Sequence, residues 1–361
     1  MSRTIGLDTI WLRPTPRFAH TEYSMEYHPG YIAKVLGRAL VKGGVSRTAS
    51  DYDILSTPVR RQFYDAWDFD FLWNTHDGLV DWGRAGRCTD MGHAVYASDG
   101  SDQRAPVQCP FTSPEEVWDF DPVKEYGLPG FDELVKAYEE QYQQMSADFP
   151  EQVVTGGYYK TVISGAIQIF GWDMLLQAAA DKEKFARVLD RIGSYSLFHA
   201  KAWAKTSVQV YIQHDDMVWT SGPFMSPAFY RSAIFPIYRT LWVPLKQAGK
   251  KVIYCSDGTY DMFIEDIAAC GADGFFFEPT NDLDSIVKRI GRIHVILGSK
   301  CDCRTMAFAP WGKVQAEIEA TVPLARQCPG FIWAVGNHIP ANVSDDTCDK
   351  YMARLRTVWN R

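Results

Sequence analysis

Reactive side chains follow a series of short apolar runs in the second half of the chain. A carboxylate pair can hold a proton, because each charge raises the pKa of the other, and carboxylates, thiols and imidazoles are all metal ligands. The runs and the residues after them are VQVYIQ with His214, Asp215 and Asp216, KVIY with Cys255, Ser256 and Asp257, GFFF with Glu278, HVIL with Gly298, Ser299 and Lys300, and FIWAV with Asn337 and His338.

The spacing of these runs predicts strands that alternate with helices. Apolar runs of this length separated by helical segments are typical of a parallel sheet buried on both faces. The predicted strands are 208–213, 251–255, 273–277, 293–298 and 331–335. The predicted helices are 227–248, 261–270, 283–290, 311–327 and 345–358, preceded by a helical region at 173–206 that we expect to break near Gly193.

Strands that deliver chemical groups at their carboxyl ends favour an α/β fold of the (β/α)8 TIM-barrel type. We expect one domain over residues 1–361, in which 1–150 form an N-terminal helical elaboration plus the first parts of the barrel. Helical pieces are predicted at 30–40, 58–66, 114–119 and 131–147. The open-sheet alternative would need a phosphate-binding glycine loop, and neither GxGxxG nor GxxxxGK[ST] is present.

Composition excludes several classes of protein. A formal net charge of −7 argues against non-specific binding to nucleic acid or to an anionic membrane. No apolar run approaches the roughly 20 residues that span a bilayer, and the first residues do not look like a signal peptide. Eight cysteines without a CxxC pair fit a reducing compartment, so we expect a cytoplasmic protein.

The run from Val208 to Gly258 resembles the uroporphyrinogen decarboxylase superfamily. It has an acidic pair after a strand, then Gly-Pro, Ser-Pro and a helix that leads to a strand ending in Cys-Ser-Asp-Gly. The later blocks ACGADGFFFEP and GNHIPANVSDDT are similar to that superfamily too. The resemblance covers about 150–361 and implies a (β/α)8 barrel with an N-terminal elaboration.

One branch of the superfamily decarboxylates porphyrinogens. Its members resemble one another in an N-terminal Arg-Gln-Ala-Gly-Arg loop that clamps a polycarboxylate substrate, whereas this chain has LRPTPR at 12–17. The Ala-Gly-Arg at 85–87 lies far downstream. A polycarboxylate needs clustered arginines, which are not evident here, so this reaction is disfavoured.

The other branch contains corrinoid-dependent methyltransferases, whose zinc-bearing members use a His-x-Cys strand end, a later Glu and a late Cys. This chain has Cys255 and Asp257 at the His-x-Cys positions, Glu278 follows 21 residues after Asp257, and His338 falls near the late ligand. The resemblance therefore implies a metal set of Asp257, Glu278, His338 and Cys255, with zinc as a candidate ion.

The blocks TDMGHAVY, GGYYKT, IFGWDML, SDG and GNHIP look like superfamily members that demethylate aromatic methyl ethers. In such a reaction reduced cobalt supplies the nucleophile, and the leaving oxygen needs a proton or a Lewis acid. The catalytic candidates are Asp216, Asp257, Glu278 and His338. The candidates for substrate binding are His93, Tyr158, Trp172, His214 and Asp215.

The leading hypothesis is a methyltransferase that moves a methyl group from a small aromatic methyl ether to the cob(I)alamin of a partner corrinoid protein. Aromatic residues make up 14% of the chain and could line a pocket for a planar ring. A decarboxylase acting on a porphyrinogen or a smaller carboxylate, and a non-catalytic protein that binds a corrinoid or porphyrin, remain as alternatives. The sequence allows a homodimer and does not identify the methyl donor.

Overall fold

The computed structural model describes residues 2–25, 28–37, 56–89, 91 and 108–361. The strands in this part of the chain are β1 (Ala19–His20), β2 (Phe71–Leu72), β3 (Val153–Val154), β4 (Gly156–Tyr158), β5 (Val210–His214), β6 (Lys251–Cys255), β7 (Gly274–Phe276), β8 (Val295–Leu297) and β9 (Phe331–Trp333). Seven form one parallel sheet in the order β1-β9-β8-β7-β6-β5-β4, and β2 pairs with β3 in a second.

Hydrogen bonds between the two sheets close them into a ring. The N–H of Asp70, just before β2, donates to the carbonyl of His20 in β1 at 2.8 Å. On the other side, β3 continues into β4 across the single residue Thr155. The strands therefore occupy eight positions around the ring, with β3 and β4 sharing one.

One buried cluster of side chains lies inside this ring. It contains residues from each of the eight strand positions, which requires the sheet to curve around a common interior. Its strand residues are Ala19, Phe71, Val153, Val210, Ile212, Ile253, Cys255, Phe276, Val295, Leu297 and Ile332. The interior is thus a packed core, and the predicted (β/α)8 architecture is confirmed.

Helices surround the ring. Those of the first half are α1 (Ser2–Ile10), α2 (Pro29–Val35), α3 (Thr57–Ala66), α4 (Trp82–Ala85), α5 (Pro114–Trp118), α6 (Pro122–Tyr126), α7 (Phe131–Asp148) and α8 (Val162–Ala178). Those that follow are α9 (Lys182–Ala204), α10 (Pro227–Phe229), α11 (Phe235–Gln247), α12 (Ile264–Cys270), α13 (Leu283–Ile290), α14 (Cys303–Phe308), α15 (Trp311–Ala325) and α16 (Asp345–Val358). Short π and 3-10 turns at Tyr230–Ile234 and Asp261–Phe263 precede α11 and α12.

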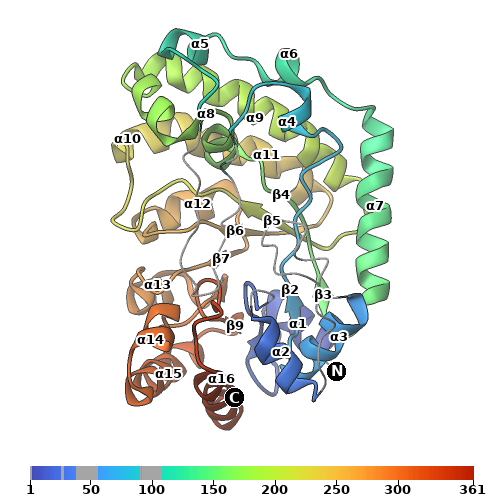
Figure 1. Cartoon of the computed structure of the whole chain (residues 1–361), viewed down its shortest axis with the longest axis vertical. Helices are drawn as coiled ribbons and strands as arrows, with labels where there is room; N and C mark the ends of the chain where they lie inside the picture. The colour runs from blue at the N-terminus through green and yellow to red at the C-terminus, as the bar shows by residue number, and fades with distance from the viewer. Residues whose placement is uncertain (1, 26–27, 38–55, 90, 92–107) are drawn as a thin grey trace.

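The two ends of the described chain lie near each other, with α16 beside the N-terminal helices in Figure 1. An isolated bridge between Arg17 and Asn360 joins them. The first two strand positions come from the first 150 residues, where no regular strand pattern was apparent. No helix in the described part of the chain is long and apolar enough to cross a membrane.

The expected helix break near Gly193 is wrong. The helix α9 runs through Gly193, and the break between α8 and α9 falls at 179–181, where Asp181 caps α9 by accepting from the N–H of Lys184. Gly193 serves packing instead, because a Cβ there would collide with Ile237 of α11. The predicted helix at 30–40 ends at Val35, and residues 38–40 lie outside the described part.

A buried ion pair ties β1 to β2. Asp70 is fully buried and accepts from both Nη atoms of Arg17, at 2.6 and 2.9 Å, and from the N–H of His20 at 2.9 Å. A bidentate pair of this kind fixes the relative position of two segments as well as their charge. It lies where the ring closes, so we expect it to stabilise the closure.

We predict that Asp70→Ala lowers the free energy of unfolding by about 3–5 kcal/mol, because it leaves a buried guanidinium and an amide without their acceptor. Urea denaturation followed by circular dichroism would measure this. Glu140→Ala is the control, since its ion pair with Lys136 is exposed and 3.7 Å long, and it should change stability little. Equal effects of the two substitutions would contradict the assigned role of Asp70.

Candidate active site

The end of β5 places three consecutive polar residues on alternating sides of the barrel wall. Side chains alternate along a strand, so His214 and Asp216 turn toward the barrel mouth while Asp215 turns toward the helices. The Oδ1 of Asp215 accepts from the N–H groups of Ile163 and Ser164, both at 2.7 Å, and its Oδ2 accepts from the hydroxyl of Tyr238 at 2.5 Å. Asp215 therefore holds the start of α8 against β5.

Asp215 was predicted to bind substrate, but its position indicates a structural role. It is fully buried, and both carboxylate oxygens are occupied by groups of the protein itself. Burial raises its pKa from 3.8 to about 6, and the neighbouring Asp216 adds a smaller contribution in the same direction. The expected mutual repulsion of the two aspartates is therefore present, although burial is the larger cause.

His214 and Asp216 form a close pair below the mouth of the barrel. The Nε2 of His214 lies 3.1 Å from Oδ1 of Asp216, and the His214 side chain is only 5% exposed. Burial lowers the pKa of His214, but the carboxylates of Asp216, Asp257 and Asp215 outweigh it, and the net pKa is raised. The pair therefore favours an imidazolium beside a carboxylate.

The pKa of Asp216 is correspondingly lowered. Burial alone would raise it, but the charge of His214 and several hydrogen bonds to the carboxylate dominate. The N–H of Asp257 donates to Oδ1 at 2.9 Å, and the hydroxyl of Tyr159 approaches Oδ2 at 3.5 Å. The N–H of Asp216 donates to the hydroxyl of Ser164 at 2.8 Å. The expected repulsion between the two aspartates contributes to the raised pKa of Asp215, whereas His214 and the hydrogen bonds to Asp216 hold the pKa of Asp216 down.

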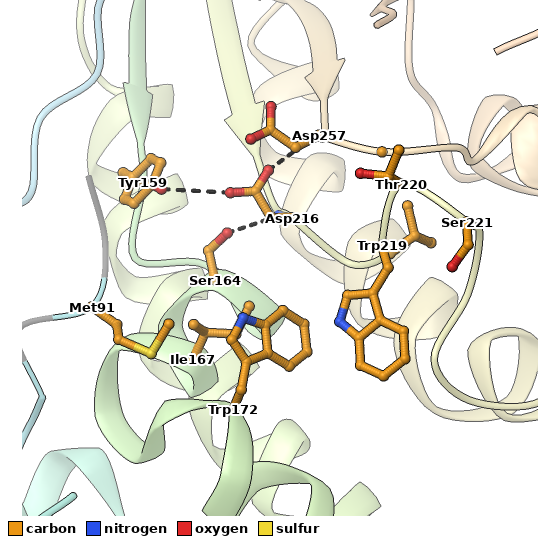
Figure 2. Close-up of a pocket in the computed structure, with 12 residues that line it drawn as sticks. Met91, Tyr159, Ser164, Ile167, Trp172, Asp216, Trp219, Thr220, Ser221 and Asp257 are labelled. Atoms are coloured by element: carbon orange, nitrogen blue, oxygen red, sulfur yellow. Dashed lines mark hydrogen bonds between the residues drawn. The ribbon is translucent and has the colours of Figure 1, made fainter. Parts of the chain in front are cut away.

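A pocket of about 640 Å³ opens above Asp216. Figure 2 shows Asp216 and Asp257 toward one end and the rings of Trp172 and Trp219 toward the other. Its described lining is Met91, Tyr159, Ser164, Ile167, Trp172, Asp216, Val218, Trp219, Thr220, Ser221, Asp257 and Gly258. The pocket thus combines an aromatic wall with a carboxylate end, which is the composition that orients a small, mostly apolar ligand.

Trp172 reaches this pocket because α8 is kinked. Gly171, the residue before it, has φ +69 and ψ 165, a conformation that favours glycine. Trp219 comes from the loop after β5 and is 42% exposed, which places it at the rim. Of the predicted substrate-binding residues that the structure describes, Trp172 is the one that lines the pocket.

Glu278 stabilises the turn after β6 and is absent from the described pocket lining. Its Oε2 accepts from the N–H of Gly258 at 2.6 Å, and its Oε1 accepts from Nδ2 of Asn337 at 2.5 Å. Gly258 has φ +81, and a Cβ there would collide with the carbonyl of Trp219. Glu278 therefore joins the ends of β6 and β9, while Asp257 projects into the pocket.

His338 lies beside the barrel axis. Its ring packs edge-on against Tyr23 at 4.8 Å between centroids, and Tyr23 also contacts His214 at 6.1 Å. The N–H of His338 donates to Oδ1 of Asn337 at 2.7 Å. His338 and Glu278 therefore belong to the same side of the mouth, next to the pocket rather than on its described lining.

The metal set implied by the resemblance does not converge as expected. Within the described chain, the group whose ligand atoms all lie within 4.8 Å of one another is His214, Asp216 and Asp257. Of the predicted set of Asp257, Glu278, His338 and Cys255, only Asp257 belongs to it. The Glu278 oxygens are engaged by Gly258 and Asn337, and burial raises the pKa of the Cys255 thiol, which therefore stays protonated.

Tyr158 points away from the pocket. It is fully buried, and its ring stacks on His199 of α9 at 4.0 Å between centroids. The next residue, Tyr159, reaches the pocket instead, because neighbours on a strand face opposite sides. The pair of tyrosines in GGYYKT could have indicated this alternation, but not which of the two faces inward. His93 lies outside the described residues.

Tyr159, Ser164 and Trp219 are among the pocket residues that the sequence analysis missed. Ser164 reaches its place because Asp215 accepts from its N–H, which turns its hydroxyl toward the N–H of Asp216. A serine at the start of a helix carries no signal of such a contact in the sequence. Trp219 lies three residues beyond Asp216, so its place in the motif after β5 was the sequence signal that could have identified it.

The pKa of Asp215 predicts a pH-dependent contribution to stability. Since the pKa is raised in the folded state, this contribution is complete below about pH 4 and is lost as the pH rises through about 6. The isosteric variant Asp215→Asn lacks this contribution. Its free energy of unfolding, relative to that of the parent, should therefore rise by roughly 1–3 kcal/mol between about pH 4 and about pH 6. Urea denaturation at several pH values would measure the difference.

The matched control is Asp216→Asn. The pKa of Asp216 is lowered, so its contribution is present above the ordinary carboxyl pKa and is lost as the pH falls. The two variants should therefore show opposite trends relative to the parent. A stability difference for Asp215→Asn that does not change with pH would show that its carboxyl is not held protonated by burial.

Comparison with known proteins assigns the chain to a family. The model of the uroporphyrinogen decarboxylase (URO-D) family matches residues 94–358. A curated uroporphyrinogen decarboxylase from Salinispora tropica is 25% identical over 137 residues, which is 38% of this chain and 36% of that protein. The match thus spans about a third of the relative's length.

One solved structure resembles the whole chain in its fold. A methyltransferase from Methanosarcina mazei is similar with a TM-score of 0.66 and 14% identity, covering 99% of this chain and 98% of that one. At this identity the likeness concerns the fold alone. The family model covers well over half of the sequence, and the chain belongs to the URO-D family.

Proposed function

We propose that the protein is a methyltransferase that takes a methyl group from a small aromatic methyl ether and passes it to the cob(I)alamin of a partner corrinoid protein. The observation that carries the proposal is the close pair of His214 and Asp216 below a pocket with an aromatic wall, in which the carboxylate raises the pKa of the imidazole. This pair can deliver a proton to an oxygen leaving group. The fold is compatible with such chemistry, since one solved protein that shares it is a methyltransferase.

The same pocket is poorly suited to a porphyrinogen. A polycarboxylate substrate needs arginine or lysine side chains around it. No arginine or lysine lines the pocket among the residues that the structure describes, and the charged groups there are Asp216 and Asp257. Arg13 and Arg17 of the N-terminal segment are engaged by Asp8 and Asp70. This distribution of charge favours an ether donor over a carboxylate substrate.

The protein residues would act on the leaving oxygen. A reduced corrinoid would supply the nucleophile that receives the methyl group. As the methyl–oxygen bond breaks, the developing phenoxide must gain a proton. A protonated His214 would supply this proton, and the Asp216 carboxylate, which lines the pocket, would relay it to the oxygen. Tyr159, 3.5 Å from Asp216, would help to keep that carboxylate in place.

Zinc fits the same three residues in ligand type. Imidazole and carboxylate are both zinc ligands, and a catalytic zinc site has three protein ligands and an open fourth position. The ligand atoms of His214, Asp216 and Asp257 lie within 4.8 Å of one another, so they would draw together around an ion. A bound zinc would supply a Lewis acid at the ether oxygen. An imidazole that binds zinc must be deprotonated, so zinc and a protonated His214 exclude each other.

The direct test is to incubate purified protein with cob(I)alamin and a panel of methoxylated phenols, following methylcobalamin by absorbance. Methyl transfer from any donor would support the proposal. No transfer together with release of CO₂ from a porphyrinogen would establish the decarboxylase alternative. If neither reaction occurs with free cofactor, the assay would be repeated with a corrinoid protein, and failure there would favour the binding-protein alternative.

We predict that His214→Gln lowers kcat by roughly 10²–10⁴-fold for a donor with a poor leaving group, because the proton source is removed. For donors that release a more acidic phenol, the substitution should lower kcat less, because their leaving oxygen depends less on protonation. The parent rate should fall as the pH rises above the raised pKa of His214, and the variant should lack that fall.

The control is His294→Gln, because His294 lies before β8 at the opposite end of the barrel. It should leave the dependence on the leaving group unchanged. An equal loss in His214→Gln for good and poor leaving groups would contradict proton donation and point to a purely structural role.

Zinc binding should compete with the His214 proton. We predict that affinity for zinc, measured by calorimetry, is roughly tenfold or more weaker at pH 6 than at pH 8, and that binding releases a proton to the buffer. Asp257→Asn should weaken binding by removing a ligand. Binding that neither depends on pH nor changes in this variant would place zinc elsewhere.

A further inference from the structure

A second group of polar side chains lies where α9 packs against the end of β4 (Figure 1). Tyr158 of β4 and Tyr195 of α9 each contact the ring of His199, at 4.0 and 5.3 Å between centroids. Lys160 follows two residues after Tyr158. Burial lowers the pKa of His199 to about 3, and the nearby charge of Lys160 adds to this effect. Tyr158, Lys160, Tyr195 and His199 are called the His199 cluster below.

Polar atoms of the His199 cluster lack hydrogen-bond partners within the described part of the chain. They are the hydroxyls of Tyr158 and Tyr195 and Nε2 of His199. Each of these side chains is at most 1% exposed, so bulk water does not reach them. A buried polar atom without a partner is costly, and three of them on contacting rings indicate a bound group that pairs with them.

Lys160 adds a buried ammonium group to the cluster. It is 5% exposed, and its Nζ lies 3.9 Å from Oδ2 of Asp77, which is beyond hydrogen-bond distance. Its other contact is the Trp82 ring, 4.9 Å away at the centroid. Burial lowers the pKa of Lys160, while the carboxylates of Asp77 and Asp81 oppose this shift. Among the described residues, the ammonium therefore has no acceptor atom at hydrogen-bond distance.

The cluster offers donors. Nδ1 of His199 lies 2.6 Å from the hydroxyl of Tyr138, which is buried and satisfies its own proton by donating to this nitrogen. That leaves the proton of the neutral imidazole on Nε2. Nε2–H, two tyrosine hydroxyls and an ammonium all then need acceptors. An anion accepts from several such donors at once and balances the charge of Lys160.

We propose that the His199 cluster binds a small monovalent anion of the halide class, such as chloride. The ammonium of Lys160 supplies the charge, and the imidazole N–H and the two hydroxyls supply further donors. Tyr159 lies between Tyr158 and Lys160 and lines the pocket, so a bound anion would hold the end of β4 that carries it. The site is distinct from the pocket, and it does not depend on methyl transfer.

The first test is thermal unfolding in sodium gluconate that is replaced stepwise by sodium chloride at constant ionic strength. Gluconate is too large to fit among packed rings, so only chloride should bind. We expect Tm to rise by roughly 1–3 °C and to saturate with chloride concentration, because a ligand of the folded state stabilises it. A Tm that does not respond to chloride would overturn the inference.

Lys160→Met removes the ammonium and keeps a long side chain, so the saturable rise in Tm should be lost. Lys136→Met is the matched control, because it removes the same charge from an exposed lysine of α7 and should retain the rise. The same rise in the parent and in both variants would show that chloride acts on the protein surface in general, which contradicts the proposed site.

A crystal of the parent protein in bromide gives a direct test. The anomalous signal of bromide should place an ion beside Nζ of Lys160 and Nε2 of His199. This measurement needs no variant, so it decides the matter even if Lys160→Met does not fold. A water molecule between these side chains, at a bromide concentration that saturates the change in Tm, would refute the anion site.

Discussion

The buried carboxylate of Asp215 is the constraint on which the site depends. It accepts two backbone N–H groups at the start of α8 and the hydroxyl of Tyr238 from α11, so one side chain joins β5 to two helices. By fixing Ser164 it also orients the N–H of Asp216. A carboxylate can satisfy several donors at once in a space where unpaired amides would be costly.

The alternation of side chains along the barrel strands separates structural residues from residues that face the mouth. Asp215 faces outward and holds the scaffold, whereas its two neighbours face the mouth and form the reactive pair. The same division recurs at Tyr158 and Tyr159, where one ring packs on His199 and the next contacts Asp216. The parallel pairing of β5 with β6 brings the β6 turn beside the end of β5, and the N–H of Asp257 then donates to Asp216.

Membership of the URO-D family establishes a scaffold but leaves its chemistry open. In the described part of the chain the mouth carries acidic groups and an imidazole, and Arg17 near the N-terminus serves the barrel closure. The same groups suit zinc in their ligand types, and the raised pKa of His214 means that a proton would compete with the metal there.

The sequence by itself determined the succession of strands and helices in the second half of the chain, because apolar period and helix caps are local signals. It also predicted that candidate site residues lie at the ends of β5 and β6, since polar residues directly after buried parallel strands emerge at one edge of the sheet. Only the tertiary structure decided which groups meet. His214 joins Asp216 and Asp257, whereas Glu278 turns to Gly258 and Asn337, because hydrogen bonds between distant segments set these orientations. The continuity of α9 through Gly193 was likewise decided by its contact with Ile237, a neighbour that no local pattern reveals.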